Sequence, residues 1–517
     1  MTSPSTTPST KASRKEWIGL GVLTVPALLV SMDLSVLFMA APRISADLRP
    51  STGQLLWIMD IYGFLMAGLL ITMGTLGDRI GRRRLLMLGA VAFGGASLLA
   101  AVSSSPETLI LARALLGVGG ATLAPSTLAL IRTMFRDDAQ RRTAVAVWTA
   151  AFGAGVPIGS IIGGLLVERF WWGSVFLINI PVMVLLLTLA PLLLPEHADP
   201  LPGRFDLLGA AQSMAAILAC VWGLKKLAED GLAVPPFVAI AAGLATSYLF
   251  VRRQRAAAQP LIDLGLFRRP AFSAAIGSNV VLTVASAGVG MLVVQHLQLV
   301  LGYRPFVAAL WMIPMVGMTV VGIVVGTVIV RWVRPGFVIG AGLACAATGF
   351  GLLTRLEAED TVGALLTGYS VLGLGMGMAI TLAYNLVVAT APPRNAGTAA
   401  ALNETGTELG GALGIAILGS IATAVYERDI SRALPGDVPA GAADAAGSTL
   451  GGALVAAEQL PSRLAESVTQ AATTAFTNGI NTTAAVGAGL LALSAVVAAT
   501  ALRGVRIDDG HSGEHGH

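Results

Sequence analysis

The sequence is poor in charge and in cysteine. Charged side chains make up 12% of its 517 residues, and Cys220 and Cys345 are its two cysteines, each inside an apolar run. These features exclude a disulfide framework, and we expect each thiol to behave as a small apolar side chain. A phosphate-binding loop is also lacking, because the glycine-rich runs lie within apolar segments and no Lys-Ser or Lys-Thr pair follows them. We therefore expect no metal, no cofactor and no ATP-driven step.

The sequence is rich in long apolar runs. Hydrophobic residues account for 55% of the chain, and about 20 of them in a row suffice for one helix to cross a bilayer. The alternating strands that a membrane barrel needs are absent, and the N-terminus lacks the apolar core and cleavage site of a signal peptide. The net charge of +4 comes from arginines between apolar runs, so it indicates loops and no nucleic-acid surface. The composition predicts an all-α polytopic membrane protein.

Fourteen apolar runs are long enough to be transmembrane helices. We group them as two six-helix halves with an inserted pair between them. If the N-terminus lies inside, most lysines and arginines fall on the cytoplasmic side, which predicts that both termini are cytoplasmic. The predicted helices cover residues 17–41, 55–76, 85–102, 107–131, 143–166, 174–194, 206–227, 236–251, 271–299, 306–330, 335–354, 361–389, 398–423 and 477–502. The predicted domains are a cytoplasmic tail (1–16), an N-terminal half (17–194), the inserted helices (195–255), a cytoplasmic linker (256–270), a C-terminal half (271–502) and a cytoplasmic tail (503–517).

The second half contains an insertion at about residues 425–476. It is rich in Ala, Gly and Ser and holds two amphipathic runs, 445–460 and 462–476, with Pro461 between them. We predict a helical hairpin on the outer face. A disordered spacer is the alternative, because loops of this length are either functional or disordered.

A short hydrophilic loop, residues 74–86, carries the most specific motif in the chain. It reads GTLGDRIGRRRLL and places one acid among several arginines at the water boundary. Its spacing resembles the loop between helices two and three of the major facilitator superfamily, which implies the fold of that superfamily and a latch role for Asp78. A plain positively charged loop is the alternative. The residues in register with the motif are Gly74, Asp78, Arg79, Gly81, Arg82 and Arg83.

Four acids stand out away from the ends of the predicted membrane helices: Asp33, Asp60, Glu404 and Glu408. An acid at mid-membrane costs on the order of 3 kcal/mol, so each must face water, a partner or a substrate. Glu404 and Glu408 are one turn apart on the same helix face, and two carboxylates this close resist simultaneous ionisation. The pair can therefore exchange a proton for a cation, although a purely structural role remains open. The opposite face is predicted to pack through Gly406, Gly410 and Gly414.

Asp33 and Asp60 lie in the stretches SMDLSVLFMAAP and WIMDIYGF. These resemble helices one and two of the fourteen-helix drug:proton antiporters, the QacA-like quaternary-ammonium efflux proteins. Asp60 has an equally strong alternative, because an acid near the start of a helix is stabilised by the helix dipole and can face the outer water. Arg113, in LILARALLGVGGA, needs an acid or carbonyl groups nearby. The resemblance implies that Arg113 relays protons or tunes a carboxylate, and a structural role is the alternative.

The run GAGVPIGSIIGG is similar to the helix-five signature of the same antiporters. Ser160 stands where that signature has a proline, and Pro157 comes three residues earlier. We expect the bend to be retained but shifted, because proline removes a helix hydrogen bond wherever it lies. The remaining matches to the signature are Gly155, Gly159, Gly163 and Gly164.

Aromatic and methionine side chains offer candidate walls for a cargo site. Aromatic faces attract desolvated cations, and methionine adapts to different shapes. Packing alone is the alternative for each. The candidates are Trp57, Tyr62, Trp148, Phe152, Trp311, Met312, Met315 and Tyr384.

These features predict a proton-coupled antiporter that is not an enzyme and that exports lipophilic cationic drugs, dyes and quaternary ammonium antiseptics by alternating access. The expected partners are such small cations, protons and the lipid bilayer, with no nucleic acid. We expect a monomer in the inner (plasma) membrane of a bacterium. Two alternatives stay open. One is a proton-coupled exporter of an endogenous lipid, siderophore or metabolite, and the other is a non-transporting membrane sensor or scaffold.

Overall fold

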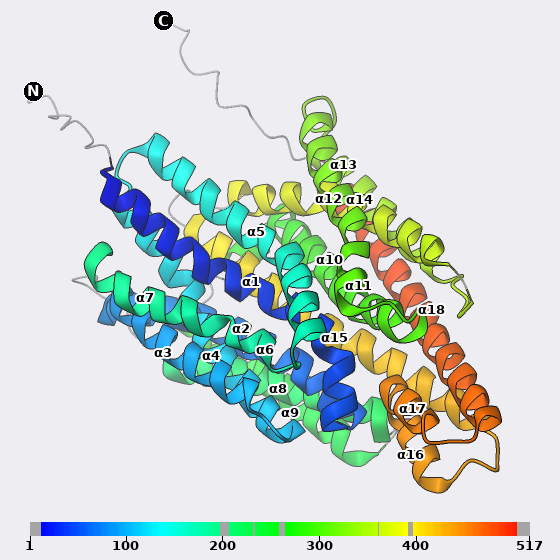
Figure 1. Ribbon diagram of the computed structural model, residues 1–517. Coiled ribbons are helices and arrows are strands. Elements are labelled where there is room, and N and C mark those ends of the chain that lie inside the picture. Colours follow the sequence, from blue (N-terminus) through cyan, green and yellow to red (C-terminus); the bar gives the residue numbers. More distant parts are fainter. Residues whose placement is uncertain are drawn as a thin grey trace, which may run out of the picture. The chain divides into compact units, whose positions relative to one another are not determined.

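The computed structural model describes residues 12–196, 206–230, 233–257, 264–359, 361–390 and 396–503. This part of the chain is helical throughout and contains no β-strand (Figure 1). It divides into two compact units. The first contains Met1–Leu261 and Gly302–Leu310, and the second contains Ile262–Leu301 and Trp311–His517.

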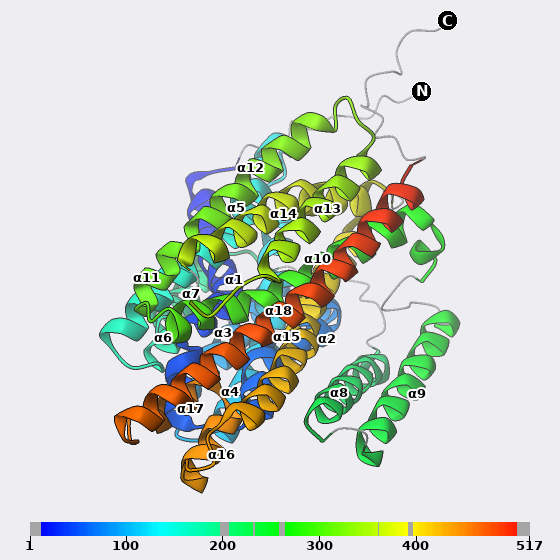
Figure 2. The same ribbon diagram turned by 90° about the vertical axis from the view of Figure 1, so that its right-hand side faces the viewer.

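The first unit is a helical bundle that includes the inserted pair α8 and α9. Within it α1 packs along α5, α2 and α3 pack on α4, and α7 packs on α1 and α3. Helix α8 packs on α2, and α9 lies beside α8 (Figure 2). The helices are α1 (Arg14–Leu48), α2 (Thr52–Ile80), α3 (Arg82–Ala101), α4 (Pro106–Met134), α5 (Asp138–Arg169), α6 (Ser174–Leu177), α7 (Asn179–Leu193), α8 (Leu207–Asp230), α9 (Val234–Ala256) and the start of α11 (Pro305–Trp311).

The second unit is also a bundle. Its main contacts join α10 to α15, α12 to α14, α13 to α14, and α13 and α15 to α18. Its helices are η1 (Leu266–Arg268), α10 (Pro270–Gln295), the π-helical turn η2 (His296–Val300), α12 (Ile313–Ile329), α13 (Pro335–Leu353), α14 (Val362–Thr390), α15 (Ala396–Ala433), α16 (Ala440–Ser448), α17 (Leu450–Ala457) and α18 (Ser462–Ala501).

The prediction of fourteen membrane helices is confirmed. The described residues contain 14 helical segments that are long and apolar enough to cross a membrane. Some predicted spans are interrupted. The span that begins at Pro305 breaks between α11 and α12 at Met312, and Pro314 lies in the first turn of α12. Proline is accommodated there because the first turn of a helix has no internal acceptor for that N–H group.

The insertion differs from its prediction. The run 462–476 packs on α17, as the second arm of a hairpin would, but it is the first part of a longer helix, α18, which continues to Ala501. The run 445–460 is broken at Thr449, whose hydroxyl caps α17 by accepting a hydrogen bond from Gly452 N at 3.0 Å. Helix α15 also extends past its predicted end, because Asp429 accepts a hydrogen bond from Asn478 of α18. That partner stabilises polar residues which the sequence alone indicates to be loop.

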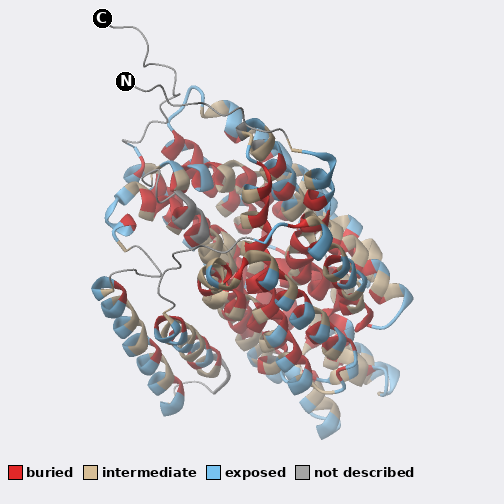
Figure 3. Cartoon of the chain, turned by 90° about the vertical axis from the view of Figure 1, so that its left-hand side faces the viewer, coloured by how far each residue is buried: buried red, intermediate tan, exposed pale blue. Residues whose placement is uncertain are grey.

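Small residues set how closely the helices approach. In the second unit a Cβ added at Gly377 of α14 would collide with the carbonyl of Thr319 on α12. A Cβ at Gly342 of α13 would lie 2.9 Å from the carbonyl of Gly375 on α14. Buried residues gather where helices meet, and exposed ones follow the outer faces (Figure 3). Helices in lipid are held together mainly by van der Waals packing, with little help from the hydrophobic effect. Glycine at a contact lets two helix backbones come close enough for that packing.

We predict that Gly377→Ala destabilises the protein by about 2 kcal/mol, because overpacking forces the backbone of α12 to move. Thermal unfolding of the purified protein measures the change. Gly277→Ala, in α10 of the same unit, is the control, since a Cβ added at Gly277 meets nothing within 4 Å. Equal melting temperatures for the two variants would contradict the packing argument.

Candidate functional site

A buried ion pair joins α1 to α4 in the first unit. The Arg113 guanidinium contacts the Asp33 carboxylate, and their side chains are 0% and 4% exposed. Arg113 Nε also donates to the carbonyl of Ile58 on α2 at 3.1 Å. The guanidinium lies 4.8 Å from the ring centroid of Tyr62, also on α2. Arg113 therefore links three helices and has the acid and carbonyl partners that its position within a membrane helix requires.

The glycines after Arg113 explain how α4 comes so close to α2. A Cβ at Gly117 would lie 2.6 Å from the carbonyl of Tyr62, and one at Gly120 would lie 3.0 Å from the Tyr62 hydroxyl. That hydroxyl donates to the carbonyl of Val30 on α1 at 3.3 Å. The glycine cluster that follows the arginine in sequence is thus what allows the arginine to reach α1 and α2.

A second buried ion pair joins α2 to the inserted helix α8. Lys225 Nζ lies 3.0 Å from Asp60 Oδ1, to which it donates a hydrogen bond, and 2.8 Å from Asp60 Oδ2. The same ammonium lies 3.9 Å from the ring centroid of Trp57. Asp60 is 1% exposed and Lys225 is 2% exposed. The alternative in which Asp60 faces the outer water is therefore wrong, because the acid is covered and paired.

Sequence reasoning missed Lys225. It occurs in GLKKLAED, which resembles the polar end of a helix, although the apolar span of α8 runs through Leu227. The available signal was a cation inside an apolar run in a chain that also has an unassigned acid on α2. The packing of α8 on α2 decides that Lys225 pairs with Asp60. At this helix contact a Cβ added at Gly68 of α2 would lie 2.8 Å from Met214 Cε of α8.

The other ends of the inserted helices are also tied together. Arg253 of α9 donates to Asp206, just before α8, with Nη2 2.7 Å from Oδ1. These hydrogen bonds hold the pKa of Asp206 below its usual range. The α8 and α9 pair thus has a surface ion pair at one end and a buried ion pair to α2 at the other.

In the second unit, Glu404 and Glu408 lie on α15 and are half-buried. The predicted glycine face is confirmed. A Cβ at Gly410 would lie 3.1 Å from the carbonyl of Val280, and one at Gly414 would collide with Val284, both on α10. One residue round the helix from Glu404, Asn403 Oδ1 accepts a hydrogen bond from Asn279 of α10 at 2.9 Å. The buried amides fix the rotation of α15, and thereby the direction in which its glutamates point.

The loop between α2 and α3 is held by ion pairs within the first unit. Asp78, in the last turn of α2, pairs with Arg82 at the start of α3. Gly81 between them has φ +103°, and an added Cβ there would collide with Glu196. Glu196 Oε1 accepts from the backbone N–H of Arg83 at 3.2 Å, and its carboxylate lies 3.4 Å from Arg83 Nε. Glu196 therefore caps α3, where an anion is favoured by the helix dipole.

Glu196 was not identified from the sequence. It follows the sixth apolar run in PEHADP, and the excess of arginine in the loop was the one signal that an acid was needed there. Only the fold brings the end of α7 beside the start of α3, where Arg83 Nη1 also donates to the carbonyl of Leu194 at 3.0 Å.

Comparison with known proteins decides the family. The family model described as Major Facilitator Superfamily matches residues 23–415. The chain belongs to the Major Facilitator Superfamily. It is therefore a transporter and a multi-pass membrane protein.

Curated relatives are efflux and resistance proteins. The multidrug efflux pump LfrA of Mycolicibacterium smegmatis is 41% identical over 96% of this chain and 98% of its own length. The methyl viologen resistance protein SmvA of Salmonella typhimurium is 34% identical over 89% of this chain and 93% of its own length. These relatives support transport by drug efflux.

Among solved structures, a bacterial homologue of the human lysosomal transporter Spinster in an inward-facing, occupied conformation matches with a TM-score of 0.67 and 16% identity. The match covers 95% of this chain and 98% of the other. At this identity the likeness shows the Major Facilitator fold alone.

The helix-five glycines of this superfamily member form the contact between α5 and α1. A Cβ at Gly155 or Gly159 would collide with the hydroxyls of Ser31 or Ser35, and one at Gly163 would lie 3.0 Å from the Cα of Val36. Helix α5 is continuous through Pro157. Gly164 instead faces Pro305, at the start of α11. The motif thus places α5 against the part of α1 that carries Asp33.

The candidate wall residues divide between the two units. In the first unit, Trp57 covers Lys225, Tyr62 lies on Arg113, and Trp148 stacks on Phe152 with ring centroids 5.4 Å apart. Of the candidates in the second unit, three are half-buried and one is exposed. The half-buried ones are Trp311, Met312 and Met315, and the exposed one is Tyr384. The structure therefore brings Trp57 and Tyr62 to the buried charges, which is the strongest part of the predicted wall.

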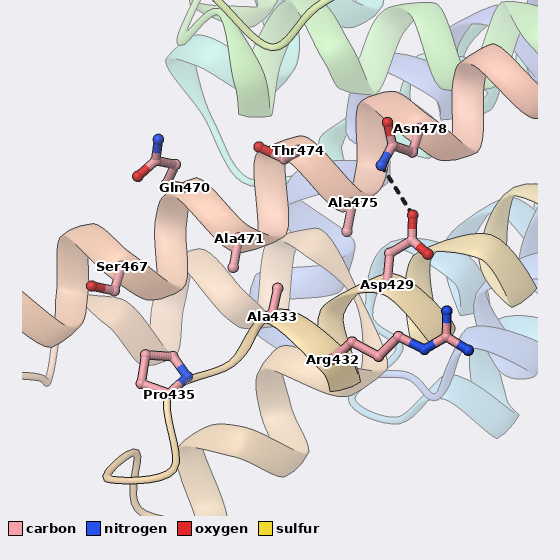
Figure 4. Close-up of a pocket in the computed structure, with 10 residues that line it drawn as sticks. All are labelled: Asp429, Arg432, Ala433, Pro435, Ser467, Gln470, Ala471, Thr474, Ala475 and Asn478. Atoms are coloured by element: carbon pink, nitrogen blue, oxygen red, sulfur yellow. Dashed lines mark hydrogen bonds between the residues drawn. The ribbon is translucent and has the colours of Figure 1, made fainter.

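One cleft of the second unit contains none of the predicted residues. It has a volume of about 620 Å³ and lies between the end of α15 and the start of α18 (Figure 4). Asp429 accepts a hydrogen bond from Asn478 across it at 3.0 Å. The lining is polar or small, with Arg432, Ser467 and Gln470 among its members. It lacks the apolar or aromatic wall that a lipophilic cargo needs.

We predict that Gly81→Ala destabilises the protein by about 2 kcal/mol or more, since a non-glycine residue at positive φ costs about 1–2 kcal/mol and the methyl group also collides with Glu196. Gly74→Ala, within α2 and seven residues before Gly81, is the control because its Cβ meets nothing within 4 Å. Melting temperatures of the two purified variants measure the difference. A Gly81→Ala variant as stable as Gly74→Ala would be inconsistent with this loop geometry.

We predict that Asp33→Asn lowers the stability by about 3 kcal/mol, because it leaves the Arg113 guanidinium buried without its counter-ion. Asp47→Asn, an exposed acid on the same helix, should leave the stability unchanged. Thermal unfolding in detergent compares the two. Stability unaffected by Asp33→Asn would mean that the guanidinium does not depend on this acid.

Proposed function

We propose that this protein is a proton-coupled antiporter that exports lipophilic cationic drugs, dyes and quaternary ammonium antiseptics by alternating access. The observation that carries the proposal is the set of acids within the membrane spans. Asp33 and Asp60 are buried in the first unit, and Glu404 and Glu408 lie one turn apart on α15. Carboxylates at this depth are the groups by which a membrane protein binds cations and protons.

The names of the relatives support the same class of cargo. LfrA is named as a multidrug efflux pump, and SmvA for resistance to methyl viologen, which is an aromatic dication. The aromatic side chains beside the buried acids, Trp57 and Tyr62, suit cargo of this chemistry because their faces attract cations.

Glu404 and Glu408 are our candidates for the coupling site. Two carboxylates one turn apart in a poorly hydrated region resist ionising together, so a proton bound by one of them is released when a cation binds the pair. On the outer side a proton taken from the medium then displaces the cation, which returns the site to its protonated starting state, so protons move inward as the cation moves outward. Asp33 is already neutralised by Arg113, so its role in this scheme is to hold α1 and α4 in place.

The remaining parts of the proposal are the setting and the partners. We propose that the protein acts as a monomer in the inner (plasma) membrane of a bacterium, with both termini cytoplasmic. The turn at Gly81, which is shorter than the loop predicted for residues 74–86 because α2 runs to Ile80 and α3 begins at Arg82, would then lie on the cytoplasmic side, where the ion pairs beside it can act as a latch between transport steps.

We predict that cells or proteoliposomes containing the protein export ethidium in an uncoupler-sensitive manner, and that Glu404→Gln or Glu408→Gln reduces efflux to the level without the protein. The reason is that an amide neither releases a proton nor attracts a cation. Fluorescence of intracellular ethidium measures the rate. Glu466→Gln is the control, because this glutamate of α18 is exposed.

Two results would argue against the proposal. If efflux persists in both glutamine variants, Glu404 and Glu408 of α15 do not couple proton movement to efflux. A well-expressed parent that exports no dye would leave transport of an endogenous lipid, siderophore or metabolite as the better hypothesis, and variants of these acids would then lose coupling without losing cargo affinity.

A further inference from the structure

The ammonium of Lys225 occupies a place with the two features of an organic-cation site. Nζ lies 2.8 Å and 3.0 Å from the two carboxylate oxygens of Asp60. It also lies 3.9 Å from the ring centroid of Trp57. A carboxylate beside an aromatic face is the combination that recognises alkylammonium and quaternary ammonium ions. Here the site is filled by a side chain of the protein itself.

Two buried ion pairs lie close together around this place. Asp60 pairs with Lys225, and Asp33 pairs with Arg113, whose guanidinium lies on the Tyr62 ring. All four charged side chains are at most 4% exposed. A further cation entering this desolvated cluster would find both carboxylates already neutralised, so nothing would offset the cost of its own desolvation. A cationic cargo can therefore bind to Asp60 only after one of the protein's own cations has left.

Lys225 is the cation that can leave. Arg113 is held by Asp33, by the carbonyl of Ile58 and by Tyr62, and its guanidinium does not lose its charge. Lys225, by contrast, carries a compact and strongly hydrated charge on a flexible stem. It lies about 7.5 Å along the axis from the end of α8 at Asp230, which is within reach of water for an extended lysine.

We propose that Lys225 is a tethered occupant of a cation site formed by Asp60 and Trp57, and that a transported lipophilic cation takes its place during the cycle. The inference rests on the proposed function, because it needs a cationic cargo. It assigns a role to the inserted helix α8, which supplies the competing charge. The return of Lys225 to Asp60 would expel the bound cation, so the same competition that lowers affinity also promotes release.

The first test is equilibrium binding of ethidium to the full-length protein in lipid nanodiscs. Lys225→Met removes the competitor and keeps the length of the side chain. If Lys225 occupies the site about nine-tenths of the time, its loss should lower the Kd for ethidium on the order of tenfold. Lys226→Met is the control, since the next residue points about 100° away around the helix and should leave the Kd unchanged.

A double variant separates this mechanism from a general change of charge. Asp60→Asn combined with Lys225→Met removes the acid that the dye is expected to reach, so the gain in affinity should disappear. Tighter binding that survives in the double variant would overturn the proposal, and so would a folded Lys225→Met protein whose Kd equals or exceeds that of the parent.

The second test uses the unaltered protein and does not depend on the folding of a variant. An amine-acetylating reagent is applied with and without saturating ethidium, and modification is read at Lys225 and Lys226 by mass spectrometry. Displacement predicts that ethidium increases acetylation of Lys225, because its ammonium leaves Asp60 for water. Unchanged or decreased acetylation of Lys225 would overturn displacement.

Loss of transport and loss of the displacement of Lys225 give different results in these experiments. If the parent neither binds nor exports ethidium, the proposed function fails and this inference fails with it. If the parent exports ethidium while Lys225→Met does not tighten binding and acetylation is unaffected, the inference alone fails.

Discussion

The structure depends on one constraint, which is the high free energy of a charge placed in hydrocarbon. Every charged side chain that the first unit carries deep within its spans, among the residues described, has a counter-charge in contact. A buried ion pair adds little stability compared with apolar packing. Removing one of its two residues, however, leaves the charge of the remaining residue buried without a counter-ion, at the full cost of its desolvation. The pairs therefore specify which helices meet and in which register. Arg113 fixes α4 against α1 and α2, and Lys225 fixes α8 against α2.

The ion pairs can form only where helix backbones come close enough. Gly117 and Gly120 allow α4 to reach α2, and the glycines of α5 allow it to reach α1. In the second unit Gly410 and Gly414 do the same for α15 against α10. Close packing and charge pairing are thus coupled, because a bulkier residue at one of these positions would also separate charges that cannot be left alone in the membrane.

The two pairs of acids have different surroundings, and this difference suggests different tasks. Asp33 and Asp60 are each paired with a cation of the protein, and Glu404 and Glu408 lie one turn apart on one face of α15 beside an amide network. An acid that is paired with a cation of the protein either holds two helices together or resists the binding of a competing cation. Two adjacent acids favour exchange between a proton and a cation. An efflux transporter needs both properties, since its cargo must bind and must also leave.

The sequence by itself determined the fold and the helix count, because about 20 apolar residues per span is a requirement that hydrocarbon imposes on any chain. It also determined which residues carry charge into the membrane on four of the helices. It did not identify Lys225 or Glu196, since each lies near the end of an apolar run and looks like an ordinary boundary residue. Nor did it reveal that residues 462–476 and the last membrane span form one continuous helix, α18. Those features were decided only by the tertiary structure, because a partner from a distant helix is what makes a buried charge or an extended helix stable. Lys225 and Asp60 are 165 positions apart, and nothing local to either one specifies the other.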